Sequence, residues 1–211
     1  MVRGIIIVAA LTALMIAVVG FWYLRVEESQ TAPEGPATGQ QQRQGEALIG
    51  GPFSLVNQGG ERVTEADFAG RYMLVYFGYT YCPDFCPMSL STMTRALDLL
   101  EPEQAERVVP VFITVDPERD TVEHLSEYAA LFGPRLVALT GTAAETDAAA
   151  RAYRVYHNKV EADASAADYL MDHSVFTYLM GPDGHYVTHF GHDATPEEMA
   201  ERLRGYLEQS A

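Results

Sequence analysis

Apolar and polar residues alternate along this chain in a way that predicts strands followed by helices. Tyr72–Phe77 is a continuous apolar and aromatic run that ends at Gly78, which is typical of a buried strand. Apolar residues then recur at helical spacing from Leu90 to Leu100. Further segments continue the pattern, in the order strand 108–115, helix 120–132, strand 136–139, helix 142–153, strand 174–180, strand 185–190 and helix 195–208.

Turn and capping signals support this order. Residues 51–56 and 61–64, joined by Asn-Gln-Gly-Gly, predict an early hairpin. Asp120, Thr142 and Thr195 are each followed three residues later by Glu, which predicts three helix starts. Strands that alternate with helices, and then a hairpin with a closing helix, indicate an α/β fold. We expect a thioredoxin-like sandwich, in which helices flank a central mixed sheet.

The N-terminal pattern is different. Ile5–Leu24 is an uncharged apolar run of about 20 residues, or about 30 Å as a helix, which matches the core of a bilayer. The alternative is a cleaved signal peptide, but this run is too long for one and no A-x-A site follows it. Arg3 before the run favours an N-terminus inside and the remainder exported. We expect a single-pass transmembrane helix in a bacterial inner membrane, with the folded domain in the periplasm.

A polar segment follows the apolar run. Residues 27–46 contain Pro and Gly and almost no apolar side chains, so they predict a flexible linker. The expected organisation is therefore an anchor over 1–26, a linker over 27–46 and a folded domain over 47–211. The formal net charge of −15 argues against nucleic acid and against anionic membrane surfaces as partners.

The only two cysteines, Cys82 and Cys86, lie in the stretch VYFGYTYCPDFCP between the first long strand and its helix. Pro87 fits the first position of a helix and disfavours helical geometry at Cys86, so the helix is predicted to begin at Pro87 with Asp84 as a capping residue. Both sulfurs then lie at the positive end of the helix dipole, which stabilises a thiolate. Two such thiols are compatible with a metal site, a redox pair or a structural disulfide, and their spacing does not choose among these.

Four blocks together resemble the Sco/SenC family: GPFSLVNQGGERVTEADFAGRYMLVYFGYTYCPDFCP, VFITVDPERDT, YAALFGPRLVALTG and DYLMDHSVFTYLMGPDG. Proteins of this family are membrane-anchored, thioredoxin-like copper proteins that assist cytochrome c oxidase assembly. The resemblance implies that Cys82, Cys86 and His173 are copper ligands, and it draws attention to Asp116. Two thiolates and one imidazole also suit Cu(I) chemically, whereas zinc usually takes a fourth ligand. The expected cofactor is copper as Cu(I), and whether Cu(II) also binds is left open.

The resemblance implies a periplasmic copper chaperone, a binding and transfer protein without turnover chemistry. Its partners would be a donor protein or small carrier that supplies copper and the copper-accepting subunit of cytochrome c oxidase, whose dinuclear centre receives it. The alternative is a thiol–disulfide oxidoreductase that uses Cys82 and Cys86 to reduce the acceptor's cysteines or to sense redox state. That alternative has no need of His173.

Other polar residues have two interpretations each. Asp172 either orients a ligand or faces solvent, and Asp116 either serves the site or pairs with Arg119. Tyrosines 76, 79 and 81 are interpreted as packing residues. The remaining histidines are interpreted as ordinary side chains, namely His124, His157, His185, His189 and His192.

Overall fold

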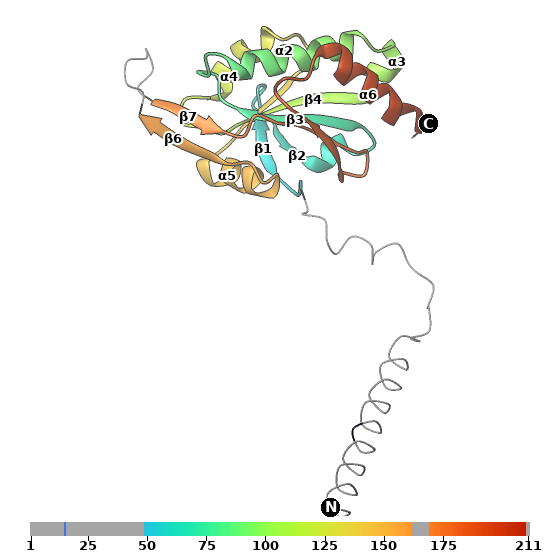
Figure 1. Ribbon diagram of the computed structural model, residues 1–211. Coiled ribbons are helices and arrows are strands. Elements are labelled where there is room, and N and C mark those ends of the chain that lie inside the picture. Colours follow the sequence, from blue (N-terminus) through green and yellow to red (C-terminus); the bar gives the residue numbers. More distant parts are fainter. Residues whose placement is uncertain (1–14, 16–48, 162–168, 210–211) are drawn as a thin grey trace, which may run out of the picture. The chain divides into compact units, whose positions relative to one another are not determined.

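The computed structural model describes residue 15, residues 49–161 and residues 169–209 (Figure 1). Ala47–Ala211 forms a compact unit with its own core. The predicted anchor at Ile5–Leu24, apart from Met15, and the predicted linker lie outside the described residues. Among the residues that are described, there is no helix with the length and apolar character that crossing a bilayer requires.

The centre of the fold is a seven-stranded mixed sheet, with strand order β2-β1-β5-β4-β3-β8-β9. Strands β3, β4 and β5 are parallel to one another, whereas β1, β2, β8 and β9 join antiparallel. The predicted mixed sheet and the early hairpin are therefore confirmed. The strands are β1 Ser54–Asn57, β2 Arg62–Thr64, β3 Tyr72–Gly78, β4 Val108–Thr114, β5 Val137–Thr140, β8 Thr177–Met180 and β9 Tyr186–Phe190.

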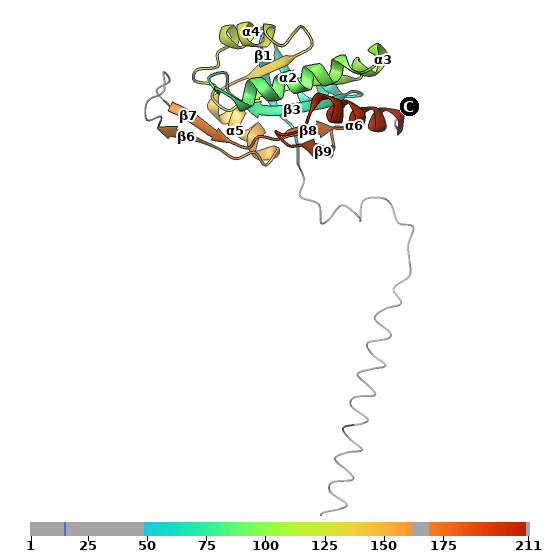
Figure 2. The ribbon, with the colours of Figure 1, turned by 45° about the horizontal axis from the view of Figure 1, so that its top comes forward.

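Helices cover both faces of this sheet. Figures 1 and 2 show α2, α4 and α6 on one face and α5 on the other. The connections β3-α2-β4 and β4-α4-β5 step across the sheet in the same direction, and right-handed crossovers then place α2 and α4 on the same face. The helices are η2 Glu65–Phe68 (a 3-10 turn), α2 Phe85–Asp98, α3 Pro102–Ala105, α4 Val122–Ala130, α5 Ala143–Ala152 and α6 Pro196–Gln209.

The core lies along β3 and β4, where all seven residues of each strand are buried. Such strands need continuous apolar sequence because helices cover both of their faces. Helix α2 packs on them through Leu90, Met93 and Leu97, each fully buried. Burying a side chain of this size stabilises the fold by about 1.5–3 kcal/mol. This packing holds the N-terminal end of α2, and with it the cysteines, against the end of β3.

A second, two-stranded sheet was not predicted. Strands β6 (His157–Glu161) and β7 (Tyr169–His173) pair antiparallel, with His157 opposite His173. Figures 1 and 2 show this hairpin beside the main sheet. The sequence HNKVE of β6 is mostly polar and its residues are largely exposed, so it lacks the alternation that marks a half-buried strand. The strand predicted at 174–180 correspondingly begins later, at Thr177.

Two predicted helix starts are wrong. Helix α2 begins at Phe85 rather than Pro87, so Cys86 lies within its first turn. This is possible because the first helical N–H groups have no partner inside the helix, and Pro87 at the third position loses no hydrogen bond. Asp84 occupies the N-cap position but makes no side-chain capping bond. Helix α4 is capped by Thr121 rather than Asp120.

The other two starts are confirmed. Thr142 and Glu145 form a reciprocal capping box at α5. Thr195 and Glu198 exchange hydrogen bonds of 3.0 and 3.2 Å at the start of α6.

Candidate metal centre

The two cysteines lie where β3 passes into α2. Cys86 is fully buried in the first turn of the helix, and Cys82 is half-buried in the preceding loop. The backbone N–H of Cys86 donates to the Cys82 sulfur at 3.5 Å, and the Cys82 N–H donates to the Tyr79 carbonyl at 3.3 Å. Neither cysteine is part of a disulfide. The start of the helix therefore directs an N–H group at the more exposed sulfur.

His173, at the end of β7, lies beside this loop although it is 87 residues from Cys86. Its Nε2 atom is 3.5 Å from the Cys86 sulfur, and its Nδ1 atom is 3.0 Å from the Ser174 carbonyl oxygen. Since a carbonyl only accepts, Nδ1 carries the proton and Nε2 presents its lone pair to the cysteines. The rings of Tyr76 and Tyr79 lie nearly perpendicular to the imidazole, at centroid distances of 6.1 and 5.8 Å, and hold its plane.

The ligand atoms of Cys82, Cys86 and His173 all lie within 4.8 Å of one another. The group combines two sulfurs with one nitrogen and has three members among the described residues. This donor set fits a soft ion of low coordination number, for which Cu(I) is the biological example, better than tetrahedral zinc. The tertiary structure thus brings together the three residues that the sequence singled out.

The two thiols differ in their protonation. The neighbouring Cys86 thiol is the main cause that lowers the pKa of Cys82, to about 4, and hydrogen bonds from the Cys86 and Asp84 backbone add to it. Burial raises the pKa of Cys86, and the adjacent Cys82 sulfur raises it further. At neutral pH the group therefore holds one thiolate, Cys82, beside one thiol, Cys86. The Tyr76 hydroxyl, 3.9 Å from the Cys86 sulfur, stays protonated because burial raises its pKa.

A pocket of about 470 Å³ opens beside the group. Cys82 and His173 line it, whereas the buried Cys86 does not. A partner that enters this pocket would reach Cys82 first. The remaining lining residues come from the cysteine loop, the start of α2, the β6–β7 hairpin and the segment after it: Tyr79, Pro83, Asp84, Phe85, Val160, Leu170, Met171, Asp172 and Val175.

The two aspartates and five histidines that the sequence left with other interpretations all lie outside the group of three ligands. Asp172 is exposed, and the group that orients His173 is the Ser174 carbonyl instead. Asp116 is buried and pairs with Arg119 at 2.5 Å. The five other histidines lie outside the metal-binding group. His124 stacks on the Tyr81 ring and His157 lies 3.3 Å from Asp147.

The sequence did not identify the residues that surround His173. Tyr76 and Tyr79, interpreted only as packing residues, contact the imidazole directly. Tyr169, four residues before His173, hydrogen-bonds to Asp116. The DPERD motif was the one signal that could have pointed to this contact, because it places charged residues at the end of a buried strand.

Fold and site together define a thioredoxin-like protein with a Cys-Cys-His group positioned for a metal. The chain belongs to the SCO1/SenC family, whose profile matches residues 41–208. It is 42% identical over 184 residues to "Protein SCO1 homolog 1, mitochondrial" of Arabidopsis thaliana, covering 85% of this chain and 53% of that protein. It is 39% identical over 188 residues to the "SCO2-like protein" of Rickettsia felis, covering 89% and 90% of the two chains.

The fold matches a solved structure in which the metal is present. "Structure of Bradyrhizobium japonicum ScoI with copper bound" aligns with a TM-score of 0.69 and 43% identity, covering 75% of this chain and 99% of that one. The chain spans only about half to three fifths of the length of the eukaryotic relatives, from 53% to 62%.

Proposed function

We propose that this protein binds Cu(I) as cargo through Cys82, Cys86 and His173 and delivers it to the dinuclear copper centre of cytochrome c oxidase. The observation that carries the proposal is the convergence of two sulfurs and one imidazole nitrogen within 4.8 Å. Membership of a family in which some solved structures hold copper supports the choice of metal.

The protonation states of the two cysteines predict the order in which the three ligands bind the ion. The Cys82 thiolate, at the pocket, meets the incoming ion without losing a proton. Cys86 then gives up its proton as its sulfur joins the ion, and His173 adds the neutral Nε2. We expect about one proton to be released for each Cu(I) bound at pH 7. Three ligands leave one side of the ion open, so an acceptor cysteine can attach before the protein's own ligands leave.

We also propose where the protein acts and which partners it meets there. An anchor over residues 1–26 and a linker over 27–46 would tether the domain of residues 47–211 to the bacterial inner membrane on its periplasmic side. Copper would come from a donor protein or a small carrier in that compartment. The acceptor would be the copper-binding subunit of the oxidase, which lies in the same membrane.

The test compares the reduced full chain with its His173→Ala variant. Cu(I) is titrated without oxygen in competition with a chelator, and copper-edge X-ray absorption gives the ligands. We expect one tight equivalent with two Cu–S bonds and one Cu–N bond in the parent protein. The variant should lose the Cu–N bond and at least the roughly 10–100-fold in affinity that loss of a group supporting a ligand costs.

The matched control is His185→Ala, which removes an exposed imidazole outside the metal-binding group. It should bind like the parent protein. Equal, weak binding by all three proteins would refute the chaperone function. So would failure of the copper-loaded protein to metallate a reduced dinuclear-copper acceptor domain.

A second function, thiol–disulfide exchange, is favoured by the unequal cysteines. The Cys82 thiolate would attack a partner disulfide, and one partner sulfur would leave as a thiolate. Cys86, on losing its proton, would then attack the Cys82 sulfur of the mixed disulfide. The partner leaves with both thiols reduced, and Cys82–Cys86 becomes the disulfide. This reaction should survive in His173→Ala, which separates it from copper binding.

A further inference from the structure

The imidazole and the two sulfurs lie at the ends of strands from different sheets. Cys82 and Cys86 follow β3 of the seven-stranded sheet, whereas His173 ends β7 of the two-stranded sheet. In the described part of the chain, no strand pairing joins the two sheets. A ladder of backbone hydrogen bonds therefore does not set the distance from His173 to the cysteines. Besides the short link through residues 174–176 from His173 to β8, side-chain contacts between the hairpin and the main body set it.

The loop between β4 and α4 supplies such contacts to the hairpin. Asp116, 1% exposed, accepts a hydrogen bond of 2.8 Å from the Tyr169 hydroxyl and one of 2.5 Å from Arg119 Nε. Arg119 Nη1 donates to the Tyr169 carbonyl oxygen at 3.0 Å. The guanidinium group also lies over the Tyr169 ring, 3.6 Å from its centroid. Both the side chain and the backbone of Tyr169 are thus held, four residues before His173.

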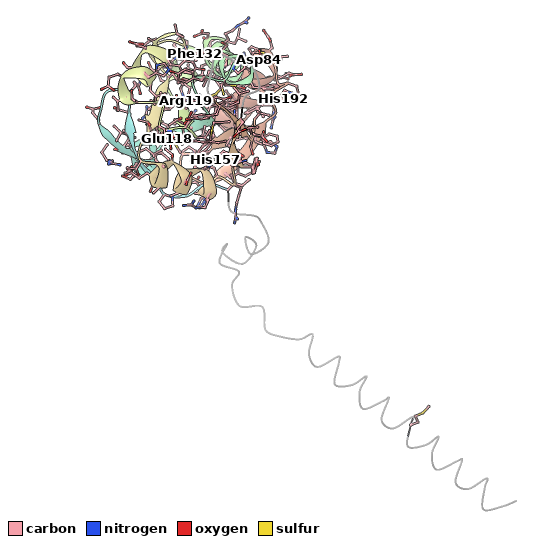
Figure 3. All side chains as sticks on the ribbon, turned by 90° about the vertical axis from the view of Figure 1, so that its left-hand side faces the viewer. Asp84, Glu118, Arg119, Phe132, His157 and His192 are labelled. Atoms are coloured by element: carbon pink, nitrogen blue, oxygen red, sulfur yellow. The ribbon has the colours of Figure 1, made fainter. Side chains whose placement is uncertain are left out.

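The same loop also contacts the segment that leads into the cysteine loop. Asp120, fully buried, accepts hydrogen bonds from the Thr80 N–H at 3.1 Å and the Thr80 hydroxyl at 2.6 Å. Thr80 lies two residues before Cys82. Arg119 also lies 4.7 Å from the centroid of the Tyr81 ring. Figure 3 shows Arg119 near the middle of the folded domain in that view, with Asp84 of the cysteine loop above it and His157 of β6 below it.

We propose that Asp116, Arg119 and Tyr169 are positioning residues that place His173 against the two cysteines. The segment Asp116–Asp120 acts as one brace. Its Asp120 binds Thr80 before the cysteine loop, and its Asp116–Arg119 pair binds Tyr169 of β7. This inference deepens the proposed function and rests on it where copper is concerned. The residues do not touch the metal. They limit how far β7 can move from the sulfurs, so that Nε2 is in place when the ion arrives.

The most selective variant is Tyr169→Phe. It removes the hydroxyl bonded to Asp116 and leaves the ring under Arg119 and the carbonyl that Arg119 holds. Arg119→Lys is the stronger variant, because lysine keeps the charge but loses the planar fork and the stacking. Tyr156→Phe is the matched control, on a tyrosine that is 59% exposed just before β6.

The first measurement uses Cu(I) competition and copper-edge X-ray absorption on the reduced full chain. We expect Tyr169→Phe to weaken Cu(I) binding about tenfold and to reduce the Cu–N contribution, and Arg119→Lys to weaken binding further, up to about 100-fold. Tyr169→Phe is also combined with His173→Ala. If the hydroxyl acts through His173, it should have no further effect once the imidazole is gone. An equal loss in both backgrounds would overturn the proposal.

The second measurement needs no copper and so separates this inference from the proposed function. Hydrogen exchange is followed in the metal-free protein and in the same variants. Amides of Tyr169–His173 should exchange faster in Tyr169→Phe and Arg119→Lys, while those of β3 and β4 keep the rates of the parent protein. Unchanged exchange in β7 would overturn the brace. Faster exchange everywhere would show general destabilisation and would overturn it as well.

Discussion

Gly78 is the last residue of β3, and a methyl group added there would meet the metal-binding group directly. A Cβ atom at this position would lie 2.6 Å from the Cys86 sulfur. It would also lie 3.0 Å from a Tyr76 ring carbon and 3.1 Å from a Phe112 ring carbon. Carbon–carbon contacts are optimal near 3.5–4.0 Å, so Gly78→Ala forces these side chains to move.

The magnitude follows from the burial of the three neighbours. Cys86, Tyr76 and Phe112 are all fully buried, so none can turn into solvent to make room. Overpacking of a well-packed core costs about 1–3 kcal/mol in the free energy of unfolding. In a domain of about 150–250 residues each kcal/mol lowers Tm by about 2–4 °C. The expected fall in Tm for Gly78→Ala is therefore about 2–12 °C. Cu(I) affinity should fall as well, since the nearest atom displaced is a ligand sulfur.

The assay is thermal unfolding of the reduced, metal-free protein, followed by Cu(I) competition. Gly205→Ala is the matched control, because Gly205 lies inside α6 and an added Cβ meets nothing within 4 Å. That substitution should stabilise the protein by about 0.5–1 kcal/mol through helix propensity and leave copper binding unchanged. If Gly78→Ala unfolds at the parent Tm and keeps the parent's Cu(I) affinity, the Cys86 sulfur does not lie where the structure has it.

Two further predictions concern the thiols and a helix cap. In the reduced, metal-free protein, iodoacetamide should modify Cys82 selectively down to about pH 5, because its lowered pKa keeps it a thiolate above about pH 4, while buried Cys86 stays largely unmodified. Peptide mass mapping across pH 4–9 checks this, and Cys82 labelling that appeared only above pH 8 would contradict it. Thr142→Ala removes the acceptor of the Glu145 N–H at the start of α5 and should cost about 0.5–2 kcal/mol in urea unfolding. Thr92→Ala, a change within α2, is the comparison, and an equal effect of the two would argue against the capping box.

Much of the fold could be predicted because its strongest elements are local patterns. Continuous apolar sequence identified β3 and β4, because burial on both faces requires apolar residues throughout. Helical spacing identified α2, because burial on one face leaves a helical period. Capping boxes marked α5 and α6 for the same reason, because the atoms that cap a helix lie three residues apart. The β6–β7 hairpin leaves no such trace. Strand β6 is mainly polar, and the position of the hairpin depends on Asp116, Arg119 and Tyr169.

For the site, the sequence alone determined that two thiols stand at the start of a helix, and the resemblance added His173. Chain distance could not show that this imidazole approaches Cys86, because the contact joins residues 87 positions apart through two separate sheets. The sequence also could not show which cysteine is ionised, because the motif places both cysteines at the start of the helix. Only the tertiary structure decided this, by burying Cys86 and leaving Cys82 at the pocket, where hydrogen bonds stabilise its charge.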